Sequence, residues 1–237
     1  MKICIVNNIY YPYKTGGAEK SVQILAESLA RIKQEVFIIT LSKNKNYSVR
    51  MVNGLKVYNL RIPNIYWPWD DKPKRKIMRI LWHFVDQYNL LVTRKVGRIL
   101  RKEKPTVAIT NNLAGFSVSV WRVIKKNRIH LLHILRDYYL LCVRQTKYKK
   151  NRNCHRQCKL CAIHSQIKLL ASLSVDNVIG ISNFILEEHI KYGFFGSTNK
   201  VVIGNPISTA SANSIPLERS PFTIGYIGKI ASRKGIE

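Results

Sequence analysis

Two groups of residues in this chain could take part in chemistry. The first is the pair Gly16 and Gly17, which follows a short apolar segment and a polar loop and precedes a predicted helix. Glycines let the backbone approach a ligand closely, and the free N–H groups in the first turn of a helix favour an anion. A tight turn without a ligand is an equally good interpretation, because the six-residue glycine fingerprint of dinucleotide-binding proteins is absent.

The second group is four cysteines in a basic insertion, residues 142–161: Cys142, Cys154, Cys158 and Cys161. Four thiolates could hold a structural Zn²⁺, with His155 or His164 as a substitute ligand. Zinc would give a fixed shape to a basic loop that has no core of its own.

Two other interpretations of the cysteines remain open. The spacing Cys154-x3-Cys158-x2-Cys161 matches the radical-SAM iron–sulfur motif, but that motif follows the first strand of a barrel and not a late insertion. Alternatively, the residues are ordinary reduced cysteines in a cytosolic loop. Metal analysis of the purified protein distinguishes these interpretations.

The net charge of the chain is unusually positive. Forty Lys and Arg residues face 13 Asp and Glu residues, which gives a formal net charge of +27, while 46% of residues are hydrophobic. The hydrophobic content indicates a globular protein. Such a basic surface attracts nucleic acid, anionic lipid or phosphorylated substrates without choosing among them. No apolar run is long enough to span a bilayer and no signal-peptide pattern is present, so we expect a cytoplasmic protein.

Apolar strand patterns alternate with helical patterns along the chain. This alternation predicts an α/β fold with a Rossmann-like, doubly wound parallel sheet. Asn53-Gly54 predicts a hairpin turn between two strands. The remaining strands are expected at residues 3–6, 36–41, 107–110, 129–135, 177–181 and 201–203, and the helices at 18–32, 77–102, 113–126, 163–173 and 182–192.

The helical pattern at 77–102 has an apolar face, with basic residues at both ends. One interpretation is a helix packed on the sheet with solvated charges. The other is a basic amphipathic surface that lies on an anionic membrane, where Trp67 and Trp69 of the preceding loop would enter the headgroups.

The last part of the chain predicts a domain boundary. Residues 207–221 are rich in Ser, Ala, Asn and Pro, as interdomain linkers are, and residues 222–227 form a fresh strand pattern. We therefore expect a first domain at 1–206, a linker at 207–221 and the start of a truncated second domain at 222–237. One strand cannot bury itself, so the chain is expected to be a fragment of a protein about twice as long.

The order of these signals resembles the family 4 retaining glycosyltransferases, which have two Rossmann-like domains (the GT-B fold). The resemblance depends on the order and spacing of the pieces across the chain, since no single piece is specific. The pieces are Pro12 with Gly16-Gly17-Ala18-Glu19, Thr110-Asn111-Asn112 with Gly115, the segment 135–142, Ile181-Ser182, the segment 202–206, and the segment 225–229 with Lys234-Gly235.

The resemblance implies a nucleotide-diphosphate sugar donor in a cleft between the domains and a polysaccharide or glycolipid acceptor on the N-terminal domain. Gly16 and Gly17 would approach the donor phosphates or the acceptor. Lys229 and Lys234 match the basic pair that grips the diphosphate. Fixed cations can stabilise the departing phosphate, so transfer is expected to need no metal or other cofactor.

The resemblance also points to residues at the ends of strands. Asp137 is the candidate catalytic residue, and its structural alternative is the cap of a turn or helix. Arg136 stands where the family often has His; it cannot act as a base but could pair with a phosphate of acceptor or donor. The other residues expected to line the cleft or contact the acceptor are Glu19, Asn111, Asn112 and Asn205.

The paired glutamates of the family's second domain would lie beyond Glu237. We therefore expect this 237-residue chain alone to show no transfer activity. Two rival functions remain. One is a basic nucleic-acid-binding module built on a cysteine zinc knuckle, which is disfavoured because Tyr10, Tyr11 and Tyr13 lie in a loop and not on a sheet face. The other is an inactive remnant that binds membrane or a partner protein.

Overall fold

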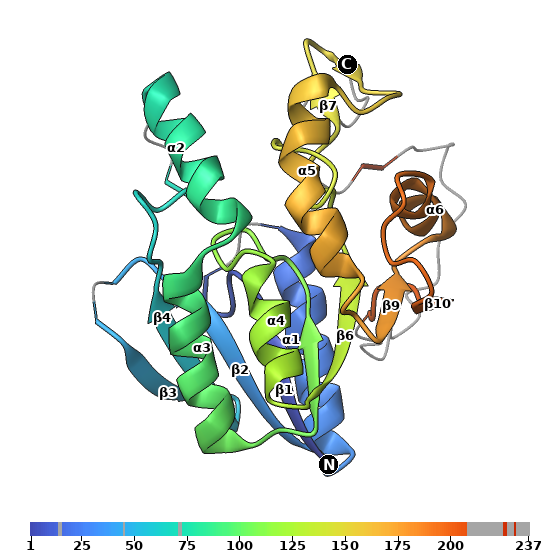
Figure 1. Ribbon diagram of the computed structural model, residues 1–237. Helices are drawn as coiled ribbons and strands as arrows, with labels where there is room; N and C mark the ends of the chain where they lie inside the picture. The colour runs from blue at the N-terminus through green and yellow to red at the C-terminus, as the bar shows by residue number, and fades with distance from the viewer. Residues whose placement is uncertain (14–15, 45, 71–72, 208–224, 227–229, 231–237) are drawn as a thin grey trace.

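The structure is a computed structural model that describes residues 1–13, 16–44, 46–70, 73–207, 225–226 and 230 (Figure 1). Its main sheet contains eight strands in the order β10-β9-β6-β5-β1-β2-β4-β3. All neighbouring strands in this sheet run parallel except β3, which pairs antiparallel with β4. The predicted doubly wound α/β fold is therefore confirmed.

The strands and helices alternate along the chain, as the sequence predicts. The strands of the main sheet are β1 (Lys2–Val6), β2 (Glu35–Ser42), β3 (Ser48–Val52), β4 (Leu55–Arg61), β5 (Val107–Thr110), β6 (His130–Leu135), β9 (Asn177–Gly180) and β10 (Asn199–Val202). The helices are α1 (Gly17–Arg31), α2 (Lys76–Gln87), α3 (Leu90–Glu103), α4 (Ser119–Lys126), α5 (Lys159–Ser172) and α6 (Asn183–Lys191). A two-stranded ribbon, β7 (Tyr148–Lys149) with β8 (Arg152–Asn153), lies in the cysteine-bearing insertion.

The central strand β1 is buried on both faces because alternate side chains enter two separate cores. Cys4 and Val6 belong to the core under α3 and α4, and Ile3 and Ile5 belong to the core under α1. Two-sided burial explains why this strand reads as an uninterrupted apolar run in the sequence.

The order of the strands reverses direction at β1. The chain extends the sheet to one side with β2, β4 and β3, and then crosses to the other side, where β5 pairs with β1. In open α/β sheets, ligands bind in the crevice at the carboxyl ends of the strands beside such a reversal. The fold therefore places a candidate site where β1 and β5 end.

The helix expected at 77–102 is two helices, and this prediction was wrong. The chain breaks at Tyr88 and Asn89, and the Asn89 side chain caps α3 by accepting hydrogen bonds from the backbone N–H groups of Leu91 and Val92. An Asn at the N-cap satisfies donors that a continuing helix would have bonded internally. The break lets α2 leave the sheet while α3 packs on it.

Two other helices start at positions that differ from the expectation. The helix expected at 113–126 begins at Ser119, because Gly115 has a left-handed φ of +86° and the residues around it form a turn. The helix expected from residue 163 begins four residues earlier, at Lys159.

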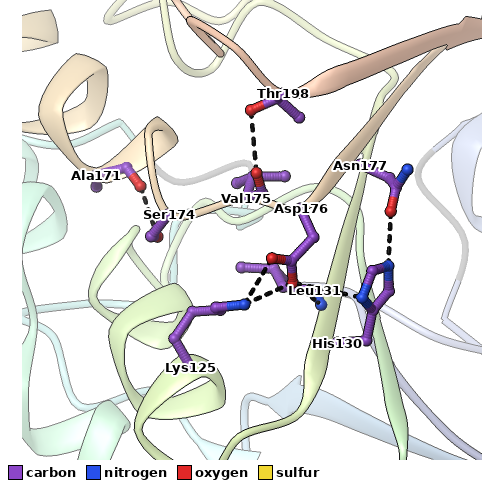
Figure 2. A network of polar contacts seen from close by, with 9 residues as sticks. All are labelled: Lys125, His130, Leu131, Ala171, Ser174, Val175, Asp176, Asn177 and Thr198. Carbon is purple, nitrogen blue, oxygen red and sulfur yellow. Dashed lines mark hydrogen bonds and ion pairs between the residues drawn. The ribbon is translucent and has the colours of Figure 1, made fainter.

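A polar network fastens the amino ends of β6 and β9 to α4, as Figure 2 shows. The Asp176 carboxylate accepts from the ammonium of Lys125 at 2.6 and 2.7 Å and from the backbone N–H of Leu131 at 2.8 Å. His130 lies 3.7 Å from the same carboxylate and contacts the Asn177 side chain at 2.6 Å. This network lies at the amino ends of the strands, whereas the candidate site lies at their carboxyl ends.

Candidate functional site

Four asparagines gather where β1 and β5 end. Asn7 and Asn8 follow β1, and Asn111 and Asn112 follow β5. The backbone N–H of Asn112 donates to Oδ1 of Asn7 at 3.3 Å, and the N–H of Asn8 donates to the carbonyl of Asn112 at 3.1 Å. The two loops therefore form one polar floor at the reversal of strand order.

This floor holds buried polar atoms that lack partners within the described residues: Oδ1 of Asn8, Nδ2 of Asn111 and Oδ1 of Asn112. A buried polar group without a hydrogen bond costs about 1–3 kcal/mol. Such a cluster has the donors and acceptors that a polar ligand such as a sugar could satisfy.

The glycine pair lies at the start of α1, which begins at Gly17. The N–H of Gly16 donates to Oε2 of Glu19 at 2.9 Å, so Glu19 covers one donor at this helix end. A side chain added at Gly17 would meet no atom within 4 Å, and one added at Gly16 would meet only Glu19 Oε2, at 3.7 Å. The described residues around the pair therefore do not require glycine at either position.

Arg136 and Asp137 follow β6, next to β5. The Nε of Arg136 donates to Oδ1 of Asn111 at 3.0 Å, and its Nη1 donates to Oδ1 of Asn205, which follows β10. Burial lowers the pKa of Arg136 to about 10, so the guanidinium stays charged at neutral pH. One cation thus joins the loops after β5, β6 and β10.

Asp137 has the structural role that was its alternative interpretation. Its Oδ1 accepts from the backbone N–H of Tyr139 at 2.9 Å, which caps a turn. Burial raises the pKa of Asp137 to about 6, and the nearby charge of Glu19 also raises it. The carboxylate is therefore ionised above about pH 6.

The sequence-predicted residues are only partly brought together by the described structure. Hydrogen bonds join Arg136 to Asn111 and to Asn205 at the carboxyl edge of the sheet, and Asp137 and Asn112 are their neighbours in the chain. Gly16 bonds Glu19, and the charge of Glu19 lies near enough to Asp137 to raise the pKa of that carboxyl. Lys229 and Lys234, the predicted diphosphate grip, lie outside the described residues, as do the linker 207–221 and the segment 222–237 apart from residues 207, 225–226 and 230.

The four insertion cysteines line one cavity of about 20 Å³ together. A hydrogen bond from the Cys161 thiol lowers the pKa of Cys142 to about 5 and raises the pKa of Cys161. All five cysteines are free thiols. In the described part of the chain, however, no three His, Cys, Asp or Glu side chains are arranged to hold a metal ion. The geometry does not support zinc ligation, and the zinc site stays a prediction from spacing.

Two features of the site are absent from the sequence predictions. Asn7 and Asn8 directly follow a buried strand, at the carboxyl end where ligands of α/β sheets bind, and this local signal could have found them. Asp86 is 1% exposed and accepts a hydrogen bond from the N–H of Gly115 at 2.6 Å, which fixes the turn after the β5 loop. No sequence signal indicates that a residue of α2 would reach this turn.

The comparison with models of protein families identifies the family of this chain. The sequence model described as Glycosyltransferase Family 4 matches residues 15–211. An uncharacterized 42.6 kDa protein in the cps region of Klebsiella pneumoniae is 35% identical over 237 residues. The chain spans 63% of that protein's length.

Solved structures share the fold at low identity. Sucrose-phosphate synthase from Thermosynechococcus elongatus has a TM-score of 0.55 and 14% identity over 86% of this chain and 47% of its own. The catalytic domain of starch synthase IV from Arabidopsis thaliana, bound to ADP and acarbose, has a TM-score of 0.51 and 13% identity over 87% of this chain and 51% of its own. The chain therefore spans about half of each of these structures. Within the described residues, no helix is both long and apolar enough to cross a membrane.

Proposed function

The chain belongs to glycosyltransferase family 4, and we propose that it is the acceptor-side part of an enzyme that transfers a sugar, with retention, from a nucleotide-diphosphate sugar to a polysaccharide or glycolipid. The proposal assigns residues 1–206 to the acceptor-side domain, 207–221 to a linker and 222–237 to the start of the donor-binding domain. The observation that carries it is the floor of unpartnered polar atoms where β1 and β5 end.

The polar floor suits a sugar acceptor. Hydroxyl groups both donate and accept, and the unpartnered atoms of Asn8, Asn111 and Asn112 offer two acceptors and one donor. Asp137 would accept a hydrogen bond from an acceptor hydroxyl, since it is ionised above about pH 6. This arrangement would orient one hydroxyl of the acceptor toward the donor.

The basic residues of the proposed cleft would stabilise the negative charge that develops in the reaction. Glycosyl transfer leaves negative charge on the departing phosphate, which fixed cations stabilise. Arg136 already lies at the edge of the polar floor. Lys229 and Lys234 are proposed to grip the diphosphate, and the backbone of Gly16 and Gly17 is proposed to approach a phosphate or the acceptor. On this proposal the transfer needs no metal cofactor.

The test is a chimera, because the chain spans only 63% of the length of its Klebsiella pneumoniae relative. Residues 1–237 would be joined to the part of the Klebsiella pneumoniae relative that follows its matching segment. The purified chimera would be offered a panel of nucleotide-diphosphate sugars with polyprenyl-linked glycan acceptors, and products would be detected by mass spectrometry. We expect transfer by the chimera, none by the 237-residue chain, and a loss of about 100-fold for Asp137→Asn.

A folded chimera that binds the donor but transfers to no glycan would count against the proposal. Turnover of a nucleotide sugar by the 237-residue chain would refute the prediction that it is inactive alone. Salt-sensitive binding of nucleic acid with no transfer would support the rival nucleic-acid module.

A further inference from the structure

Helix α2 presents a stripe of apolar side chains to solvent. Ile77, Ile80, Leu81 and Phe84 follow the i, i+3, i+4, i+7 spacing of one helix face, and they are 59, 61, 45 and 73% exposed. Trp82, on the opposite face, is 2% exposed. The predicted interpretation of this segment as a helix packed on the sheet through its apolar face is therefore wrong for α2.

Helix α5 has the same inverted pattern. Leu160, Ile163, Ile167 and Leu170 form an exposed stripe, and Ile163 is 72% exposed. The opposite face is polar and buried; its members are His164, Ser165, Lys168 and Ser172.

The buried polar faces are bonded inside the molecule. Lys168 is fully buried, and its ammonium donates to the carbonyl of Tyr139 at 2.7 Å. His164 of α5 contacts the carbonyl of His83 of α2 at 3.2 Å. A helix in water normally turns its apolar face inward. These two helices do the reverse, and exposed apolar patches of this kind mark an interaction surface.

The two stripes border one basic hollow. Ile80 of α2 and Leu160 of α5 both line a cavity of about 570 Å³ between these helices and the insertion. Its lining also includes four cationic side chains and no carboxylate: Lys76, Arg79, Arg144 and Lys149. Figure 1 shows α2 and α5 rising together beyond the end of the sheet. Apolar stripes beside a basic hollow are complementary to an anionic lipid surface, where phosphates lie next to acyl chains.

We propose that α2 and α5 dock on an anionic phospholipid bilayer, with their apolar stripes at the boundary between headgroups and acyl chains and lipid phosphates in the basic hollow. The docking does not depend on the proposed transfer reaction. The Trp67–Trp69 pair plays a smaller part than the sequence suggests. These rings contact each other with centroids 4.7 Å apart and pack half-buried against the core.

The test is vesicle flotation of the 237-residue chain. Vesicles of phosphatidylcholine alone would be compared with vesicles in which roughly a third of the lipid is phosphatidylglycerol. We expect binding to the anionic vesicles that is weakened about tenfold or more by Ile80→Ser with Phe84→Ser, and likewise by Ile163→Ser with Leu170→Ser. The matched control is Ile32→Ser with Met51→Ser, which removes two side chains that are 66% exposed outside the stripes, and its binding should be unchanged.

A second arm tests the basic hollow. Lys76→Glu with Arg79→Glu should abolish the preference for anionic vesicles, and circular dichroism should show that every variant is folded. Three results would overturn the proposal: equal binding to both vesicle types, binding by the stripe variants that equals that of the control, or a lipid-free dimer in ultracentrifugation that only the stripe variants convert to monomer. Binding to single-stranded RNA without binding to vesicles would assign the basic surface to nucleic acid instead.

Discussion

The backbone N–H of Gly115 donates to Oδ1 of Asp86 at 2.6 Å, and this bond ties helix α2 to the turn that follows the β5 loop. Gly115 has a φ of +86°, so the turn needs a left-handed residue at this point. The same turn leads into α4 and stands beside the polar floor formed by Asn111 and Asn112. Two predictions concern this pair.

Gly115→Ala should destabilise the protein by about 2–4 kcal/mol. An added Cβ would lie 2.6 Å from Cδ1 of Leu41 and 2.9 Å from Cδ1 of Ile62, and the left-handed φ strains any side chain. Urea denaturation followed by circular dichroism measures the change. Gly204→Ala is the matched control, because its Cβ would meet nothing within 4 Å. A Gly115→Ala variant as stable as the control would show that the turn can rearrange.

Asp86→Asn should make stability less dependent on pH between about 4 and 7. Burial raises the pKa of Asp86 from 3.8 to about 7 in the folded protein. The folded state therefore holds a proton that the unfolded state releases, and ionisation of Asp86 costs stability as the pH rises through this window. The Asn variant keeps an acceptor for Gly115 without that cost, so between pH 4 and 7 its free energy of unfolding should rise relative to that of the wild type by on the order of 3–4 kcal/mol.

The measurement for Asp86 is the difference in the free energy of unfolding between variant and wild type at several pH values. Lys168, whose pKa burial lowers to about 8, attracts the Asp86 charge, so points above pH 7.5 would mix two titrations. A difference that stays constant from pH 4 to 7 would mean that Asp86 titrates near its ordinary pKa.

The order of the elements could be predicted from the sequence because strands buried on both faces leave apolar runs. β1 is such a strand, and it was located to within one residue. The inverted faces of α2 and α5 could not be predicted. Helical spacing shows that Ile77 and Phe84 share a face, but only the tertiary structure shows which way that face points. The break at Asn89 could not be predicted either, because an N-cap within a continuous helical pattern is a weak signal.

The sequence offers part of the candidate site. The resemblance points to Asn111 and Asn112, and Asp137 is also marked by its place at the carboxyl end of a strand; the roles of all three stay predictions. The bond from Arg136 to Asn205 joins residues 69 positions apart. Predicting this bond requires the order of strands β5, β6, β9 and β10 in the sheet, which cannot be read from the sequence. Asp86 was missed for the same reason, because α2 contacts the β5 loop only in the folded chain.

The spacing of the insertion cysteines still predicts a structural Zn²⁺, with about one zinc per chain. Thiolates are preferred zinc ligands, although no three His, Cys, Asp or Glu side chains of the described residues are arranged to hold a metal ion. Metal analysis after purification without chelators measures the content. Cys154→Ser should lower the zinc content, whereas Cys4→Ala, in β1, should not. Metal-free protein with five reactive thiols after denaturation would leave the cysteines as ordinary reduced residues, and iron instead of zinc would favour an iron–sulfur site.

Arg136→Met should impair transfer far more than it impairs folding. The guanidinium joins Asn111 to Asn205, and no carboxylate pairs with it among the ion pairs of the described residues. An exchange for Met should therefore change the free energy of unfolding by only about 1 kcal/mol. In the chimera with a donor domain, kcat/KM should fall by about 10- to 100-fold, because the cation at the polar floor is lost.

Arg136→Lys distinguishes charge from geometry at this position. Lys keeps the cation but cannot make two directed bonds to Asn111 and Asn205 together, so a partial recovery of kcat/KM is expected if charge stabilises the departing phosphate. Arg122→Met is the matched control, since Arg122 is an exposed cation on α4 that donates to the Tyr88 hydroxyl at 3.3 Å. If Arg136→Met and Arg122→Met transfer sugar equally well, Arg136 has no role in the reaction and only holds the loops together.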